Sequence, residues 1–211
     1  MRTLDLMKLA PVVPVVVLDD VDSAVPLARA LVAGGLPVIE VTLRTGAALE
    51  GIRRIAAEVP DAVVGAGTVV TPWQVEEAAG AGSRFLVSPG CTDALRAAMT
   101  GSGLPFLPGV STVSEAMALL EHGVTELKFF PAKAAGGAPF LKALYGPIPG
   151  LSFCPTGGIT LDSAPGFLTL PNVPCVGGSW LTPADAVASG DWARIEKLAA
   201  EAASLADPVT A

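Results

Sequence analysis

Residues 37–68 read PVIEVTLRTGAALEGIRRIAAEVPDAVVGAGT, and this stretch contains one full strand–helix–strand unit. Apolar, β-branched runs at residues 37–43 and 62–66 predict two strands, and an Ala- and Ile-rich segment that begins near Gly46 predicts a helix between them. A helix that joins two strands is typical of parallel pairing. The stretch therefore predicts an α/β fold with a parallel sheet.

The same unit recurs along the chain. Further strands are predicted near Val12–Leu18, Phe85–Val87, Phe106–Leu107, Thr125–Phe130, Ser152–Pro155 and Pro174–Val176, and helices are predicted to begin near Ser23, Gly46, Pro72, Thr92, Thr112, Pro139, Leu161 and Asp191. Eight strands, each followed by a helix, predict a closed (β/α)8 TIM barrel, although a doubly wound open sheet has the same alternation. We expect one domain over residues 1–211, with a short helix in Met1–Leu9 that closes the bottom of the barrel.

The amino-acid composition excludes several classes of binding partner. The formal net charge of −7 disfavours nucleic acid and anionic membranes, which need a basic surface. Hydrophobic residues make up 51% of the chain, but prolines and glycines interrupt its uncharged runs, so no spanning helix is expected. The early run of residues 11–18 lacks a signal-peptide pattern, and Cys91, Cys154 and Cys175 have no C-x-x-C spacing. We expect a cytoplasmic protein with reduced thiols, no membrane partner and a small-molecule substrate.

Lys128 is the strongest functional clue. It lies within the apolar, strand-like run Val124–Pro131. Burial disfavours the charged form of an amine, so a lysine held there can be neutral, and a neutral lysine amine attacks carbonyl carbon. The alternative is a strand-edge lysine whose stem is buried and whose ammonium reaches water.

The carboxylate of Glu40 is predicted to point into the same barrel interior as Lys128. The period of two places Glu40, Thr42 and Arg44 on one face of their strand and Ile39, Val41 and Leu43 on the other. In a barrel the apolar set faces the helices, so Glu40 points inward, as Lys128 does on its own strand. The two can face each other, either for catalysis or only as a buried pair that fixes the strand register.

Two glycine pairs follow the last two predicted strands, Gly157-Gly158 and Gly177-Gly178 with Ser179. Glycines let backbone N–H groups approach an anion, and barrels commonly bind phosphate at these two loops. The alternative is that the glycines only make tight turns. Nothing predicts a metal site, because the one histidine, His122, lies at a helix end.

Six motifs spread in order over nearly the whole chain resemble the 2-keto-3-deoxy-6-phosphogluconate (KDPG) and 4-hydroxy-2-oxoglutarate (KHG) aldolase family. They are IEVTLRT (residues 39–45), GAGTV (65–69), SPG (88–90), LKFFPA (127–132), PTGGI (155–159) and VGGSW (176–180). The resemblance implies a class I aldolase without a metal or cofactor, commonly a homotrimer, that splits the phosphorylated keto-deoxy sugar acid into pyruvate and glyceraldehyde 3-phosphate.

The resemblance also implies residue roles. Lys128 would form the Schiff base and Glu40 would be the general acid/base. Arg44 and Thr68 would hold the carboxylate derived from pyruvate, and Pro89 and Phe130 would line the pocket. The phosphate would be contacted by Gly157, Gly158, Gly178 and Ser179. Lys133 is a departure, because the family often carries an acidic residue there.

Three other functions stay open at this point. The chain can be a 2-keto-3-deoxy-6-phosphogalactonate aldolase, because sequence does not fix the stereochemistry of the cleaved carbon. It can be a phosphate-binding barrel isomerase or epimerase that uses a glutamate base, or a barrel that only binds a phosphorylated metabolite.

Overall fold

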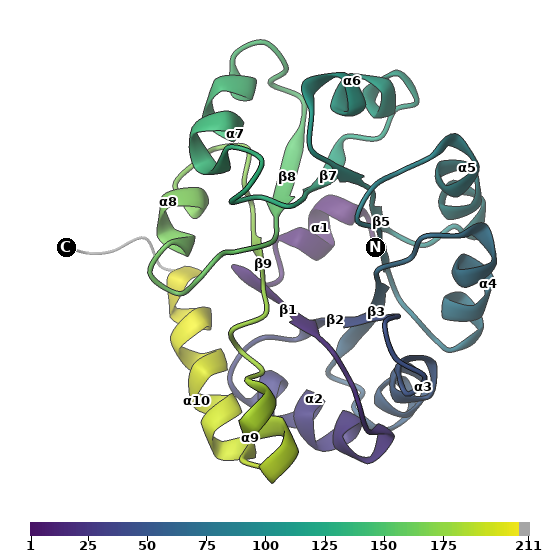
Figure 1. Ribbon diagram of the computed structural model, residues 1–211, viewed down its shortest axis with the longest axis vertical. Coiled ribbons are helices and arrows are strands. Elements are labelled where there is room, and N and C mark those ends of the chain that lie inside the picture. Colours follow the sequence, from purple (N-terminus) through teal and green to yellow (C-terminus); the bar gives the residue numbers. More distant parts are fainter. Residues whose placement is uncertain (207–211) are drawn as a thin grey trace.

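The computed structural model describes residues 1–206, in which short parallel strands alternate with helices (Figure 1). The strands are β1 (Val12–Val16), β2 (Val38–Thr42), β3 (Val63–Gly67), β4 (Leu86–Val87), β5 (Phe106–Leu107), β6 (Gly109–Val110), β7 (Glu126–Phe129), β8 (Ser152–Pro155) and β9 (Val176–Gly178). The helices are α1 (Thr3–Met7), α2 (Ala24–Ala33), α3 (Ala48–Glu58), α4 (Pro72–Gly80), α5 (Asp93–Ser102), α6 (Val113–Glu121), α7 (Gly137–Tyr145), α8 (Ala164–Leu168), α9 (Ala184–Ser189) and α10 (Trp192–Ala203), with 3-10 turns η1 (Val21–Ser23) and η2 (Ser204–Ala206).

The strands pair in two parallel sheets, one with the order β5-β4-β3-β2-β1-β9 and one with the order β6-β7-β8. The predicted α/β fold with parallel strands is thus confirmed. The predicted strand at residues 106–107 continues into β6 after Pro108, which has no N–H to donate and interrupts the ladder there. On the other side, one bridge between Thr156 and Gly177 links the region after β8 to β9.

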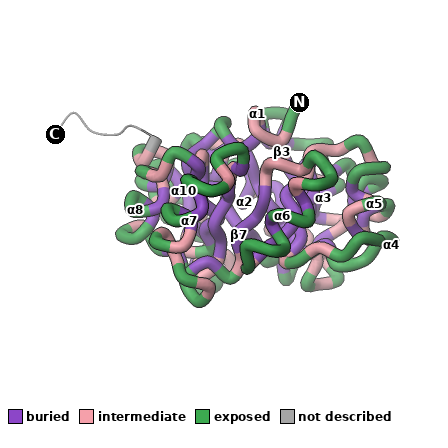
Figure 2. The backbone as a smooth tube through the Cα atoms, turned by 90° about the horizontal axis from the view of Figure 1, so that it is seen from above, coloured by how far each residue is buried: buried purple, intermediate pink, exposed green. Residues whose placement is uncertain are grey.

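Two apolar clusters stabilise this arrangement. The larger lies between the strands and the surrounding helices and includes Ile39 and Val41 of β2, as the alternation of that strand predicts. The smaller gathers inward-facing side chains on the concave side of the sheets: Leu6, Met7, Val13, Val38, Phe85, Val87, Leu107, Cys154 and Cys175. Figure 2 shows the buried residues concentrated along the strands, with exposed residues on the outer surface.

Helix α1 supplies Leu6 and Met7 to the inner cluster, both almost fully buried. It crosses the space that the strands surround (Figure 1). The short N-terminal helix predicted in Met1–Leu9 is therefore confirmed. In the same cluster, the neighbouring Cys154 thiol and burial raise the pKa of the Cys175 thiol well above its ordinary value. Both thiols are free and buried, as packing residues of a core are.

The predicted helix starts fall within three residues of the observed ones, but α9 was not predicted. Its six residues lie between Pro183 and Gly190 and are too few to show a helical period. Thr112 is the N-cap of α6, next to the predicted start of that helix, and its hydroxyl accepts a hydrogen bond from the Glu115 N–H.

Glu115 completes a capping box at the start of α6. Its carboxylate accepts hydrogen bonds from the N–H groups of Ser111 (2.8 Å) and Thr112 (2.9 Å). These bonds, that of Ser111 first, hold the pKa of the Glu115 carboxyl below its ordinary value. A lowered folded-state pKa means that the ionised side chain stabilises the fold above the unfolded-state pKa, and that this stabilisation is lost as the pH falls through the folded-state pKa.

We expect Glu115→Ala to lower the free energy of unfolding by about 1 kcal/mol at neutral pH, because the two N–H groups lose their acceptor. The difference from the unmodified protein should shrink as the pH falls through the folded-state pKa of Glu115, because the carboxyl is then protonated in both states. Urea unfolding at neutral pH and over a series of acidic pH values measures this. Glu121→Ala, at the other end of α6, is the matched control, and a pH-independent loss for Glu115→Ala would contradict the argument.

Candidate active site

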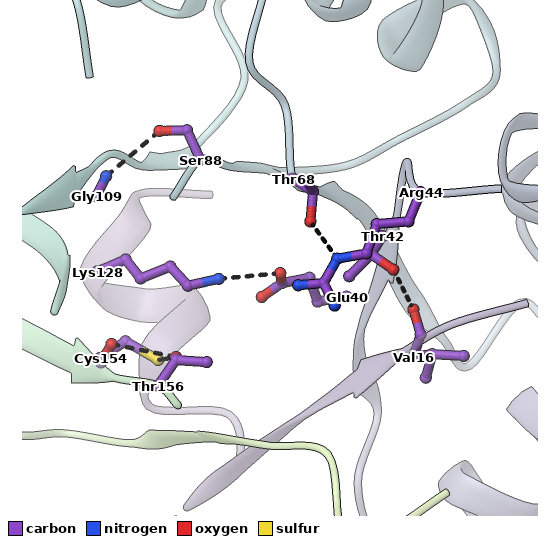
Figure 3. A network of polar contacts seen from close by, with 10 residues as sticks. All are labelled: Val16, Glu40, Thr42, Arg44, Thr68, Ser88, Gly109, Lys128, Cys154 and Thr156. Atoms are coloured by element: carbon purple, nitrogen blue, oxygen red, sulfur yellow. Dashed lines mark hydrogen bonds and ion pairs between the residues drawn. The ribbon is translucent and has the colours of Figure 1, made fainter. Parts of the chain in front are cut away.

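Lys128 of β7 and Glu40 of β2 meet in the concave interior of the sheets (Figure 3). The Lys128 Nζ lies 3.2 Å from the Glu40 Oε1, and both residues are less than 5% exposed. They belong to different sheets and are 88 residues apart in the sequence. The structure therefore brings together the two side chains that the alternation of their strands directs inward.

Gly67, at the end of β3, makes room for the carboxylate. A Cβ added to Gly67 would overlap with Oε1, Cγ and Cδ of Glu40. Thr42, two residues after Glu40, donates a hydrogen bond of 2.9 Å to the Val16 carbonyl oxygen of β1. Glu40 is thus positioned by β2, by its neighbour β1 and by the absence of a side chain on β3.

Arg44 and Thr68 lie together beside the pair. The Arg44 Nε donates a hydrogen bond of 3.2 Å to the Thr68 hydroxyl. Thr68 has a positive φ of 58°, which non-glycine residues adopt uncommonly and which turns the chain sharply after β3. Arg44 is exposed, so its guanidinium remains available for a carboxylate at the carboxyl ends of the strands.

Phe130 lies beside the Lys128 amine. The Lys128 Nζ lies 5.4 Å from the centroid of the half-buried Phe130 ring, close enough for a cation–π contact. The Pro89 backbone lies directly against Gly109, the first residue of β6.

The loop after β8 holds two consecutive glycines in the left-handed region, Gly157 (φ 104°) and Gly158 (φ 75°). Neither the Gly158 N–H nor the Ser179 N–H donates a hydrogen bond within the described residues, so both can bind a ligand. Gly177 and Gly178 are required for packing, because a Cβ would overlap with Thr156 at the first and with the Trp180 ring at the second. Only part of the predicted anion site therefore has free N–H groups.

Two cavities differ in their position relative to the candidate site. One of about 470 Å³ is lined by Ser179 together with Asp19 and Asp20, whose carboxylates would repel a phosphate on that side of the serine. A larger one of about 860 Å³ lies at the opposite, amino-terminal ends of β1 and β9 and is lined by Pro11 and Pro174. It includes neither Lys128 nor Glu40, so the chemistry of this pair belongs elsewhere.

The sequence predicts no role for two residues of the site, Gly67 and Thr156. Gly67 appears only within the GAGTV motif, and its place at the end of the strand that follows the Glu40 strand was the available signal. Thr156 is buried and lies two residues beyond Cys154, the residue of β8 that pairs with Lys128 of β7. The Thr156 hydroxyl donates a 3.4 Å hydrogen bond to the Cys154 carbonyl oxygen.

Within residues 1–206, no three side chains of His, Cys, Asp and Glu are grouped in a way that would hold a metal ion. None of the helices in this part of the chain combines the length and apolar character needed to span a bilayer.

Known proteins resemble this chain closely. The family model for KDPG and KHG aldolases matches residues 4–198. The 2-dehydro-3-deoxy-phosphogluconate aldolase of Dickeya dadantii (strain 3937) is 55% identical over 192 residues, which cover 91% of this chain and 90% of that protein. A structure of KDPG aldolase from Legionella pneumophila, with pyruvate captured at low pH as a covalent carbinolamine intermediate, has a TM-score of 0.94 and 45% identity, and covers 96% of this chain and 98% of that one.

A second structure, the 2-keto-3-deoxy-6-phosphogluconate aldolase of Zymomonas mobilis ZM4 with 3-phosphoglycerate, has a TM-score of 0.91 and 47% identity, and covers 96% of this chain and 95% of that one. The fold and these relatives define an aldolase, a lyase on an α/β scaffold. The chain belongs to the KDPG and KHG aldolase family.

Gly67→Ala tests the position of the carboxylate without removing it. The φ of Gly67 is not in the left-handed region, so alanine fits the backbone, but its methyl group should push Glu40 away from Lys128. We expect aldolase activity to fall on the order of 100-fold, because proton transfer depends on position. Steady-state kinetics measures the loss. Gly80→Ala, where a Cβ meets nothing within 4 Å, is the control; normal activity in Gly67→Ala would assign the base elsewhere.

Proposed function

We propose that this protein is a class I aldolase, without a metal or cofactor, that cleaves 2-keto-3-deoxy-6-phosphogluconate to pyruvate and glyceraldehyde 3-phosphate. The observation that carries the proposal is the buried contact of 3.2 Å between Lys128 and Glu40, in a chain 55% identical to an aldolase of that name. A lysine that forms an imine needs a neutral amine and a nearby group that accepts its proton, and Glu40 is that group.

In the first half of the reaction, the ammonium of Lys128 gives a proton to Glu40, and the neutral amine attacks the C2 carbonyl of the substrate. Glu40 returns a proton to the resulting carbinolamine hydroxyl, water leaves, and a protonated imine remains. The carbinolamine named for the Legionella structure is the pyruvate counterpart of this intermediate. The positive imine nitrogen then accepts electrons far better than the ketone oxygen would.

In the second half, Glu40 takes the proton from the C4 hydroxyl and the C3–C4 bond breaks. The C4–O bond becomes the aldehyde of glyceraldehyde 3-phosphate, and the electron pair of the broken bond forms the enamine at C3. Glu40 then protonates C3, and water hydrolyses the imine to release pyruvate and Lys128. A positioned general acid/base of this kind contributes on the order of 10²–10⁴-fold to the rate.

Substrate orientation rests on the remaining residues. Arg44, with its guanidinium held next to the Thr68 hydroxyl, binds the C1 carboxylate. Phe130 lies beside the Lys128 amine and, with Pro89, lines the pocket. The free N–H groups of Gly158 and Ser179, with Gly157 and Gly178, contact the C6 phosphate. A phosphorylated ligand in the Zymomonas relative supports a phosphate subsite in this family.

The family description also supports 4-hydroxy-2-oxoglutarate as a second substrate, which would yield pyruvate and glyoxylate. The galactonate-derived aldolase is the alternative, and comparing the cleavage rates of the gluconate and galactonate acids decides it. The phosphate-binding isomerase considered from the sequence is set aside by membership of the aldolase family.

We also propose that the chain folds as one (β/α)8 barrel domain and works in the cytoplasm. Closure is supported on one side by Pro108 alone separating β5 from β6, and on the other by the Thr156–Gly177 bridge between the two sheets. A crystal structure in which the ladder stays open on either side would refute closure, and cell fractionation tests the location.

Lys128→Ala should abolish imine formation and cleavage, because no other lysine faces Glu40. Borohydride reduction in the presence of pyruvate, followed by peptide mass spectrometry, should place the adduct on Lys128 of the unmodified protein and find none in the variant. Lys142→Ala, an exposed lysine of α7, is the control and should trap pyruvate normally. An adduct that persists in Lys128→Ala would refute the mechanism.

A homotrimer is the assembly that we propose, and exposed apolar side chains support an interface. Trp73 is 66% exposed and Val70 52% exposed at the start of α4. Sedimentation should therefore give about three times the chain mass of 21.2 kDa. Trp73→Glu should weaken the assembly, whereas Tyr145→Glu, on α7, should not. A monomeric unmodified protein would refute the trimer.

A further inference from the structure

The loop between β7 and α7 lies directly on the glycine loop after β8. The Ala132 N–H donates a hydrogen bond of 2.8 Å to the Thr156 carbonyl oxygen, and the Lys133 N–H donates one of 3.0 Å to the Gly157 carbonyl oxygen. These two bonds hold the two loops together beyond the ends of β7 and β8. The backbone of Lys133 is therefore fixed next to Gly157 and Gly158.

The side chain of Lys133 follows the same loop. A Cβ added to Gly158 would lie 2.9 Å from the Lys133 Cβ and 3.1 Å from its Cδ. The aliphatic stem thus passes over Gly158 in the space that a larger residue would occupy. The ammonium is only two bonds beyond Cδ, so it belongs to the same loop region as Gly158.

The charge of Lys133 is not used by the protein itself. The residue is exposed, and its ammonium makes no ion pair within the part of the chain that the structure describes. The other charges nearby are unfavourable to anions. The chain has a net charge of −7, and Asp162 lies in the loop after β8 that also holds Gly157 and Gly158. Asp19 and Asp20 line the cavity beside Ser179. An unpaired cation next to an anion site therefore has a large effect on the attraction of an anion to that site.

We propose that Lys133 is a specificity-determining residue whose ammonium binds the phosphate of the substrate at the Gly157-Gly158 loop. This inference rests on the proposed function. Neutral N–H groups supply direction but little charge, whereas a lysine supplies a point charge that attracts a phosphate dianion.

Two reactions separate this role from catalysis. Cleavage of the phosphorylated substrate needs the phosphate contact, whereas exchange of the pyruvate methyl protons with deuterium needs only the imine and the base. We expect Lys133→Met to lower kcat/KM for cleavage on the order of 5-fold and Lys133→Glu on the order of 20-fold, because repulsion then replaces attraction. The rate of pyruvate exchange, followed by proton NMR, should fall much less in both variants.

Two control variants and the dependence on salt test whether the charge of Lys133 causes the loss. Lys133→Arg keeps the charge and should retain most of the cleavage, and Lys142→Met should change neither reaction. The loss in Lys133→Met should shrink at high salt, which screens an exposed charge. Equal losses in cleavage and exchange, or no loss in cleavage, would overturn the role of Lys133. Absence of pyruvate exchange in the unmodified protein would instead overturn the proposed function.

Discussion

The buried contact between Lys128 and Glu40 is the constraint on which the rest of the site depends. Withdrawing two charged groups from water is costly, and their attraction offsets this only when the geometry is good. Here the geometry holds two sheets together, because Lys128 comes from β7 and Glu40 from β2. Removing one partner would leave a buried charge without a counter-charge, so the pair also constrains which strands may face each other.

Small residues and the inner cluster make that contact possible. Gly67 leaves the volume that the Glu40 carboxylate fills, and the inner apolar cluster, which includes Leu6 and Met7 of α1, occupies the interior toward the amino ends of the strands. Water is thereby excluded from that side, whereas Arg44 is exposed at the carboxyl ends. The pair therefore lies between a buried apolar cluster and an exposed arginine.

Much of this follows from local sequence because strands and their facing residues are encoded by a period of two. That period directs Glu40 and Lys128 inward, and the glycine pairs mark the ends of β8 and β9. The other features depend on contacts between residues far apart in the sequence. The close approach of Gly67 to Glu40 follows from the register of β2 and β3, and the break at Pro108 shows only once the strands that pair with β5 and β6 are known. Helix α9 is too short for its sequence to show a helical period.

The proposed anion site combines backbone N–H groups with one lysine. Other cations of this acidic chain, Arg54 and Arg194, are already paired with aspartates. Left-handed glycines present N–H groups without adding charge, and the stem of Lys133, packed over Gly158, limits the positions that its ammonium can take. A fixed cation loses less conformational entropy on binding than a free one. If Lys133 binds phosphate as proposed, its packing against glycine is therefore as relevant to that binding as its charge.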